Sequence, residues 1–153
     1  MTELSSEFPG PTPQLVVADA DAAIGFYRKV FGADELLRNH APDGRIMHSE
    51  LLIAGGRLLV VDDFDNDPAE SPPRLNGTTV RLHLYVPDVD EIYARALAEG
   101  ATGLHGPEDA FWGDRYAMIR DPFGHLWSIA TPNEDLSPAD VSRRGDTWSG
   151  FPV

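Results

Sequence analysis

Three side chains of the sequence have the chemistry of a metal site or of an acid–base centre. His48 and Glu50 lie two residues apart in an alternating segment, so both point to one face of a strand. His83 lies in a second such segment. Two histidines and one carboxylate hold Zn²⁺ or Fe²⁺ when they converge, whereas isolated histidines in strands more often form hydrogen bonds in a core or pocket. Spacing alone leaves both interpretations open.

A second group combines aromatic rings with charges in six consecutive residues, 111–116 (Phe-Trp-Gly-Asp-Arg-Tyr). As the wall of a ligand pocket, Trp112 would stack on a planar group, while Asp114 and Arg115 would set its polarity. Gly113 would allow close approach of the backbone. The alternative is a loop that packs Trp112 as a lid on the end of the fold.

Other familiar chemistry is missing from the sequence. There is no cysteine, and therefore no thiolate nucleophile, disulfide or Cys-bound metal. No G-x-S-x-G, P-loop or G-x-G-x-x-G motif occurs. The remaining histidines, His40, His105 and His125, are expected on the surface or in turns. The acidic run of Asp62, Asp63 and Asp65 is expected to be a solvated loop at the end of a strand.

The composition of the 153 residues, 42% of them hydrophobic, is that of one globular domain. Twelve basic and 25 acidic residues give a net charge of −13, which argues against a nucleic acid partner. The charge is compatible with a cationic ligand, but an acidic surface more often serves solubility alone. No apolar run approaches the ~20 residues of a membrane span, and the acidic start, residues 1–7, is unlike a signal peptide. We expect a cytoplasmic protein.

The chain contains an internal repeat. The matched segments are residues 19–21 and 88–90, residues 32–33 and 100–101, and residues 56–61 and 124–129, at offsets of 69, 68 and 68. Three matches in the same order predict two modules, each a strand, a helix and three further strands. Module one covers about 11–66, module two about 78–132, and residues 133–153 form a short helix and a tail.

Residues that can begin and end helices support the prediction of two modules. Asp19 or Asp21 can cap the first helix and Gly32 can end it, and Asp88 and Gly100 have the same roles in the second. Between these ends, apolar residues recur at three- and four-residue spacing and need a sheet to pack against.

The C-terminal segment has its own start signal. Ser137 precedes a proline and a capping-box pattern, which predicts a helix to about Arg144. Beyond it, Trp148 and Phe151 could dock on a neighbouring surface.

The strand expected at residues 80–86 has two different faces. Its even-numbered residues are apolar and should meet the helix. Arg81, His83 and Tyr85 then share the opposite face. A partly buried pocket explains that mixture better than open solvent does.

Two tandem βαβββ modules with these motifs resemble the vicinal oxygen chelate superfamily, which includes glyoxalase I, extradiol dioxygenases, fosfomycin-resistance enzymes and bleomycin-resistance proteins. The resemblance covers residues 11–132 and rests on the helix entry at 19–33 and on the segments 86–90 and 121–127. More narrowly, the segments 47–51, 111–116 and 121–125 are similar to the PhnB-like branch. It implies an α+β fold, in which both modules form a curved, partly open barrel-like sheet with helices outside. It also implies a homodimer.

Metalloenzymes of this superfamily take one metal ligand from the first and one from the last strand of each module. The resemblance places Thr12, Arg81, Val60 and Ser128 at these positions, and a slip of one residue at the turn offers Leu59 or Val61. None of these is a usual ligand, and an arginine repels the cation. We therefore expect no metal cofactor. The alternative is one divalent ion in a relocated site built from His48, Glu50 and His83.

Arg81 is thus expected where the ion would lie. A guanidinium in a partly dry cavity needs a partner. The candidates are Glu50, Asp114 or an anionic group of the ligand.

Three functions remain open. The first is a metal-free protein that binds a small cationic or aromatic molecule in a dimer pocket. The second is a glyoxalase- or dioxygenase-like enzyme with the relocated metal site. The third is a metal-free enzyme in which His83 is the general base and Arg81 stabilises an enolate or carboxylate. The expected ligand-binding residues are His48, Glu50, Arg81, His83, Tyr85, Trp112, Asp114 and Arg115.

Overall fold

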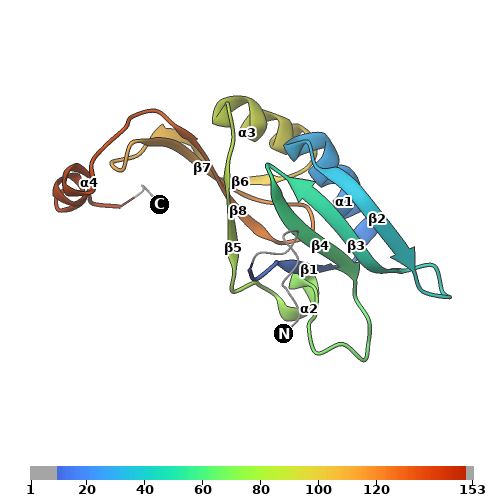
Figure 1. Cartoon of the computed structure of the whole chain (residues 1–153). Helices are drawn as coiled ribbons and strands as arrows, with labels where there is room; N and C mark the ends of the chain where they lie inside the picture. Colours follow the sequence, from blue (N-terminus) through green and yellow to red (C-terminus); the bar gives the residue numbers. More distant parts are fainter. Residues whose placement is uncertain (1–9, 151–153) are drawn as a thin grey trace, which may run out of the picture. The chain divides into compact units, whose positions relative to one another are not determined.

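The structure, a computed structural model, describes residues 10–150 (Figure 1). The chain divides into two compact units, the first ending at Thr78 and the second beginning at Thr79. Unit 1 contains β1 (Gln14–Val17), α1 (Ala20–Phe31), β2 (Asp34–His40), β3 (Ile46–Ile53), β4 (Gly56–Asp62) and α2 (Pro72–Leu75). Unit 2 contains β5 (Arg81–Tyr85), α3 (Val89–Ala98), β6 (Thr102–Asp109), β7 (Asp114–Arg120), β8 (Leu126–Pro132) and α4 (Pro138–Gly145). The predicted α+β class and the βαβββ order are confirmed, whereas the short helix α2 was not expected.

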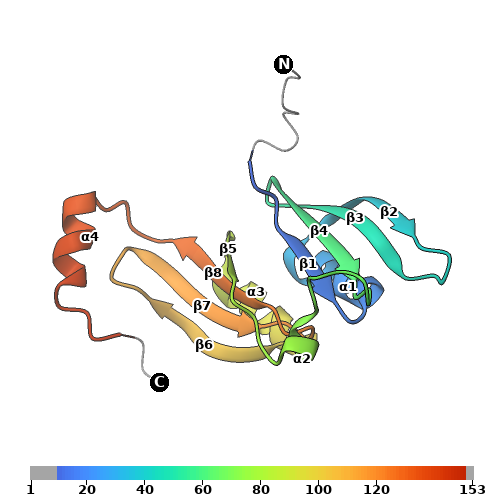
Figure 2. The ribbon, with the colours of Figure 1, turned by 90° about the horizontal axis from the view of Figure 1, so that it is seen from below.

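Each unit contains one four-stranded sheet, and its strands can be followed in Figure 2. The orders are β1-β4-β3-β2 and β5-β8-β7-β6, and neither sheet closes on itself. In both sheets the first strand pairs in parallel with the last one, and the other pairs are antiparallel. No helix among the described residues is long and apolar enough to cross a membrane.

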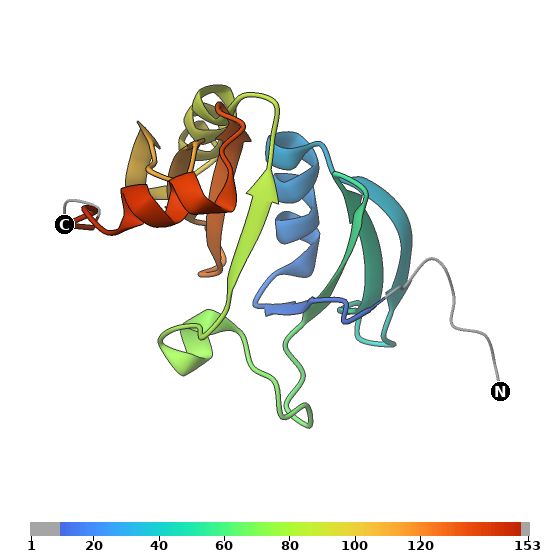
Figure 3. The same cartoon turned by 60° about the vertical axis from the view of Figure 1, so that its left-hand side comes forward.

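The helix α1 lies along one face of the unit 1 sheet, as Figure 3 shows. Asp19 caps it by accepting a hydrogen bond from the amide of Ala22 at 2.9 Å, which satisfies one of the free amides of the first turn. Ile24 and Tyr27 on its apolar stripe are fully buried. In unit 2, Asp88 caps α3 in the same way. The predicted helix starts are therefore confirmed.

The turn between β3 and β4 corrects the alignment of the two modules by one residue. Ala54 and Gly55 have positive φ angles of 47° and 82° and make a two-residue hairpin. Gly55, not Gly56, is therefore the counterpart of the turn residue Gly124. The offset of the last strands is 69 rather than 68.

This shift changes which residue of unit 1 corresponds to Ser128. Ser128 pairs with His83 across the sheet, and Leu59 pairs with Gln14 in the same manner. Leu59 is therefore the counterpart of Ser128. Val60, which is fully buried, faces the other way.

Asp62 is buried, against the expectation of a solvated acidic loop. Its Oδ1 accepts a hydrogen bond from the amide of Ala20 at 2.7 Å, and its Oδ2 accepts one from the amide of Ile46 at 2.6 Å. One carboxylate thus ties the start of α1 and the start of β3 to the end of β4. Asp63 accepts a hydrogen bond from the amide of Ser71. The expectation of a solvated side chain holds for the exposed Asp65.

The turn at residues 121–124 forms as predicted, with a hydrogen bond from the amide of Gly124 to the carbonyl of Asp121. The buried carboxylate of Asp121 accepts three further hydrogen bonds, each 2.9 Å long, from the amides of Phe123 and His125 and from Nε1 of Trp127. Trp127 is buried, as expected.

The helix α4 begins after Ser137, which accepts a hydrogen bond from the amide of Asp140, so the predicted C-terminal helix is confirmed. It lies beyond the end of the sheet, next to the β6–β7 turn (Figures 1 and 2). None of its side chains is buried. Trp148, which follows α4, contacts Phe111 within the same unit. The other residue expected to dock, Phe151, lies outside the described residues.

Candidate ligand site on the unit 2 sheet

One face of the unit 2 sheet carries a hollow of about 650 Å³, within the usual size of a small-molecule site. It is lined by Arg81, His83, Tyr85, Phe111, Trp112, Tyr116, Ser128 and Trp148. The odd-numbered residues of β5 share this face, as the alternation predicted. The expectation of a partly buried, partly dry pocket is wrong for them, because Arg81, His83 and Tyr85 are all exposed in unit 2. The neighbouring residues Leu82 and Leu84 point to the opposite face, where α3 packs.

His83 and Ser128 lie directly opposite each other on β5 and β8. Nδ1 of His83 and Oγ of Ser128 form a hydrogen bond of 2.7 Å. The ring of His83 also stacks against Tyr116, with centroids 6.4 Å apart and an angle of 17° between the planes. These contacts hold the imidazole in one orientation on the floor of the hollow.

Asp114 positions two of the rings that line the hollow. Its Oδ2 accepts a hydrogen bond from the hydroxyl of Tyr85 at 2.9 Å and another from Nε1 of Trp112 at 2.8 Å. The carboxylate is itself buried. Because Asp114 accepts the hydroxyl proton, its hydrogen bond raises the pKa of Tyr85, and burial and the negative charge act in the same direction.

This hydrogen bond predicts an alkaline transition. The folded-state pKa of Tyr85 is raised, so its contribution to stability is complete below about pH 10 and is lost as the pH rises through the folded-state pKa. The free energy of unfolding should therefore fall more steeply above about pH 10 in the wild type than in Tyr85→Phe. Urea unfolding and phenolate absorbance of both proteins over alkaline pH measure this. Ionisation of Tyr85 at the pH of a solvent-exposed tyrosine would contradict it.

Arg81 lines the hollow, but Asp114, its expected partner within unit 2, does not pair with it. Its Nη1 lies 3.3 Å from Sδ of Met118, and among the described residues of unit 2 no carboxylate forms an ion pair with it. Within unit 2, Asp114 binds Tyr85 and Trp112 instead. In unit 1, Glu50 has partners of its own. Pairing of Arg81 with Glu50 therefore stays a prediction, and within unit 2 the remaining predicted partner is the anionic group of a ligand.

In unit 1, His48 and Glu50 share one face of β3, as predicted. Nε2 of His48 lies 3.2 Å from Oε1 of Glu50, and Oε2 of Glu50 accepts a hydrogen bond from Arg57 at 2.6 Å. The third member of the relocated metal site, His83, belongs to unit 2, and the convergence of the three stays a prediction. In neither unit do three His, Asp or Glu side chains of the described residues gather to hold an ion.

Two residues of the predicted ligand wall have other surroundings. Arg115 follows Asp114 by one position, so it points to the other face of β7, where it forms ion pairs with Asp90 and Asp109. Gly113 has a φ of +100°, and a Cβ there would lie 3.0 Å from the backbone oxygen of Glu134. The group that closely approaches Gly113 is therefore the backbone at Glu134, and not a ligand.

The position of His105 could not be predicted from the sequence. It was expected in a loop or at the surface, but it lies within β6 with a mostly buried side chain. It pairs with Met118 across the sheet and its ring contacts Tyr116 edge-on. A strand containing two glycines and a proline has weak sequence signals, so its extent was hidden. His40 is exposed, as expected.

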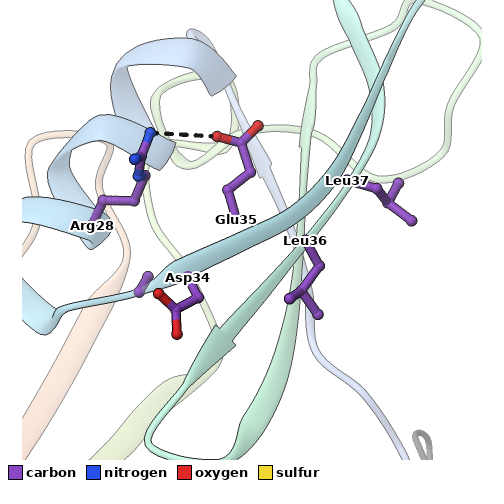
Figure 4. A pocket seen from close by; sticks show the side chains of 6 residues that line it. Arg28, Asp34, Glu35, Leu36 and Leu37 are labelled. Atoms are coloured by element: carbon purple, nitrogen blue, oxygen red, sulfur yellow. Dashed lines mark ion pairs between the residues drawn. The ribbon is translucent and has the colours of Figure 1, made fainter.

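A second hollow, of about 380 Å³, lies in unit 1 at the start of β2 (Figure 4). Arg28 and Glu35 form an ion pair of 3.7 Å at its rim, and Leu36 and Leu37 are exposed along the strand. One basic and two acidic side chains line it, Arg28 against Asp34 and Glu35, and no ring does. The hollow of unit 2 is therefore the better candidate for a ligand site.

The repeated βαβββ units and the ring-lined hollow define an α+β protein of the glyoxalase and bleomycin-resistance type. The sequence profile of the Glyoxalase/Bleomycin resistance protein/Dioxygenase superfamily matches residues 11–129, and the chain belongs to this family. The uncharacterized protein Rv0887c of Mycobacterium tuberculosis (strain ATCC 25618 / H37Rv) is 44% identical over 145 residues, which cover 90% of this chain and 85% of that protein.

Solved structures agree with this assignment. The crystal structure of TioX from Micromonospora sp. ML1 matches with a TM-score of 0.62 and 31% identity, over 80% of this chain and 98% of TioX. The PhnB protein from Bacillus cereus matches with a TM-score of 0.63 over 79% of this chain and 98% of its own. Its identity of 14% shows the shared fold alone.

The residues at the positions that the resemblance assigns to the metal ligands do not fit a metal ion. With the corrected register, these positions hold Thr12, Leu59, Arg81 and Ser128. Leu59 has no donor atom, Arg81 carries a fixed positive charge, and the hydroxyl of Ser128 already bonds to His83. Such a set lacks the imidazoles and carboxylates that bind divalent ions in proteins.

Proposed function

We propose that this chain is a small-molecule-binding protein whose ligand occupies the hollow of unit 2 without a resident metal ion. The observation that carries the proposal is that residues unable to bind a metal ion occupy the positions assigned to the metal ligands. Arg81 and Ser128 stand there in unit 2, and both line a hollow whose remaining lining is mostly aromatic. Such a site binds by stacking and by a few directed polar contacts.

The lining favours a planar aromatic ligand that carries an anionic group. Rings from β5, the β6–β7 turn and β7 offer stacking surfaces, while Arg81 offers two or more N–H groups to one carboxylate. The chain as a whole carries a charge of −13, which suits a cationic ligand at long range. However, charges are screened beyond about 8 Å at physiological salt, so nearby charges matter more, and Arg81 is the charged side chain among the lining residues of the hollow.

His83 and Ser128, on the floor of the hollow, support a second function. Because Ser128 engages Nδ1 of His83, Nε2 is the ring nitrogen that can take a proton from a bound molecule. Arg81, two residues away on the same face, would then stabilise the anion that forms. A screen for turnover separates this metal-free enzyme from a protein that only binds.

The homodimer implied by the resemblance is part of the proposal. The relocated metal site is the less favoured alternative, because Glu50 is already paired with Arg57 and His48. A metal ion would have to replace these contacts.

Metal analysis combined with a binding assay tests the proposed function. Protein purified without chelator and without nickel-affinity resin should contain far less than one metal ion per chain. The planar anion 2-anthracenecarboxylate should bind, measured by its fluorescence anisotropy, and EDTA should not change its affinity. Proflavine, a three-ring cation, is the matched control and should bind more weakly. Stoichiometric metal that is lost in Glu50→Ala would instead establish the relocated site.

A further inference from the structure

The hollow receives one wall from a part of the chain that the family profile does not include. The profile ends at residue 129, whereas Trp148 follows α4 and lines the hollow together with residues of β5 and β7. The C-terminal segment, residues 133–150, is therefore an addition to the family domain that reaches its candidate binding site.

The C-terminal segment is anchored to the turn that carries the aromatic rings. The carbonyl of Gly113 accepts hydrogen bonds from the amides of Asn133 and Glu134, both at 2.9 Å. Glu134 then binds Arg144 on α4 through two hydrogen bonds of 3.0 Å. At the end of α4, a Cβ on Gly145 would lie 3.2 Å from the ring of Phe111. Because glycine has no Cβ, the end of α4 at Gly145 can lie against the turn.

These anchors matter because α4 has no buried side chain. An eight-residue helix is marginal in water without tertiary contacts. Its contacts with the rest of unit 2 include the Glu134–Arg144 ion pair and the packing of Trp148 against Phe111. These contacts place the indole of Trp148 at the hollow, and they do not fill a core.

The rings around Trp148 are arranged as perpendicular walls. The planes of Trp148 and Trp112 meet at 79° with centroids 6.5 Å apart. Trp112 meets Tyr116 at 81° with centroids 5.3 Å apart. Trp148 keeps 44% of its surface exposed, so much of its indole is available for contact. A flat molecule that lies on one of these rings presents its edge to the next, which is a favourable arrangement.

We propose that Trp148 is a specificity-determining residue that makes the hollow selective for extended, multi-ring planar ligands. This inference rests on the proposed function and refines its ligand class to polycyclic aromatic anions. A single-ring anion can reach Arg81 and the floor at His83 and Tyr116 without meeting the C-terminal segment. A ligand of several fused rings, held by Arg81, extends to the wall that Trp148 supplies.

The test compares 2-anthracenecarboxylate with benzoate on the full-length chain. Trp148→Ala should weaken binding of the three-ring anion by roughly five- to tenfold, the effect of losing one stacking partner, and should leave benzoate binding unchanged. Trp148→Phe should retain most of the affinity. Arg143→Ala, on an exposed position of α4, is the matched control and should behave as the wild type with both anions. The unfolding temperature of Trp148→Ala should stay close to that of the wild type.

The possible outcomes are distinct. Equal affinity of the wild type and Trp148→Ala for 2-anthracenecarboxylate would overturn the role of Trp148 and leave the proposed function standing. An equal loss for both anions would also overturn it, because the segment would then act on the whole site. Failure of the wild type to bind either anion would overturn the proposed function and this inference together.

Discussion

Arg81→Ala is expected to weaken the binding of 2-anthracenecarboxylate by roughly ten- to a hundredfold. A hydrogen bond to a charged group contributes about 1.5–3 kcal/mol, and each 1.4 kcal/mol corresponds to about a tenfold change in affinity. The substitution should weaken binding without lowering stability, because Arg81 is exposed and forms no ion pair among the described residues of unit 2, 79–150. Its contact with Met118 is weak. Fluorescence titration and thermal unfolding of the variant measure both effects.

Two controls separate charge from geometry. Arg81→Lys keeps the positive charge but not the planar fork of donors, so its affinity should lie between those of the wild type and Arg81→Ala. Proflavine binding should not weaken in Arg81→Ala, because a cation gains nothing from the guanidinium. Unchanged affinity of Arg81→Ala for the anion would refute the assignment of Arg81 as the anion anchor. A lowered unfolding temperature would show that the residue has a structural role instead.

Asp62→Ala is expected to lower the free energy of unfolding by about 3–5 kcal/mol, since two charge-assisted hydrogen bonds are lost and two buried amides remain unpaired. The amides are those of Ala20 and Ile46. A change of this size is a large part of the stability of an ordinary domain. Urea unfolding, analysed with a common slope, measures it.

The neighbouring acidic residue provides the control for this prediction. Asp65, three positions along the chain, has a side chain that is 91% exposed, and its replacement by alanine should change stability by less than about 0.5 kcal/mol. Asp62→Asn keeps one acceptor oxygen and should lie between Asp62→Ala and the wild type. A similar loss in Asp62→Ala and Asp65→Ala would mean that charge density, and not the buried hydrogen bonds, determines stability in this region.

The elements of the fold could be predicted from local features of the sequence. Helix spacing, the caps at Asp19 and Asp88 and the alternation around Arg81, His83 and Tyr85 depend on neighbours within a few residues. For this reason the order of strands and helices was confirmed, as was the face on which these three side chains lie. The superfamily assignment rested on short motifs and was confirmed by the profile match.

Other features depend on contacts that are distant along the chain. The hairpin at Ala54 and Gly55 shifts the last strand by one residue, and in a strand one residue exchanges the two faces. The burial of Asp62 depends on a helix start that lies 42 residues away in the sequence. The contact of Trp148 with the β6–β7 turn likewise requires the path of the chain after β8. The spacing of residues within a single helix or strand does not predict such contacts.

The pairing of the first strand of each unit with its last one sets the order in which the chain can fold. β1 lies at the edge of its sheet and is hydrogen-bonded to β4, so no part of the unit 1 sheet can pair with it until β4 has been synthesised. The β3–β4 hairpin, closed by a two-residue turn, can form early, because short loops close fast. Parallel pairing across a long separation is slow by comparison. In each unit, docking of the first strand onto the last one is therefore the late step, and until then the edge of the last strand stays open to pairing with other chains.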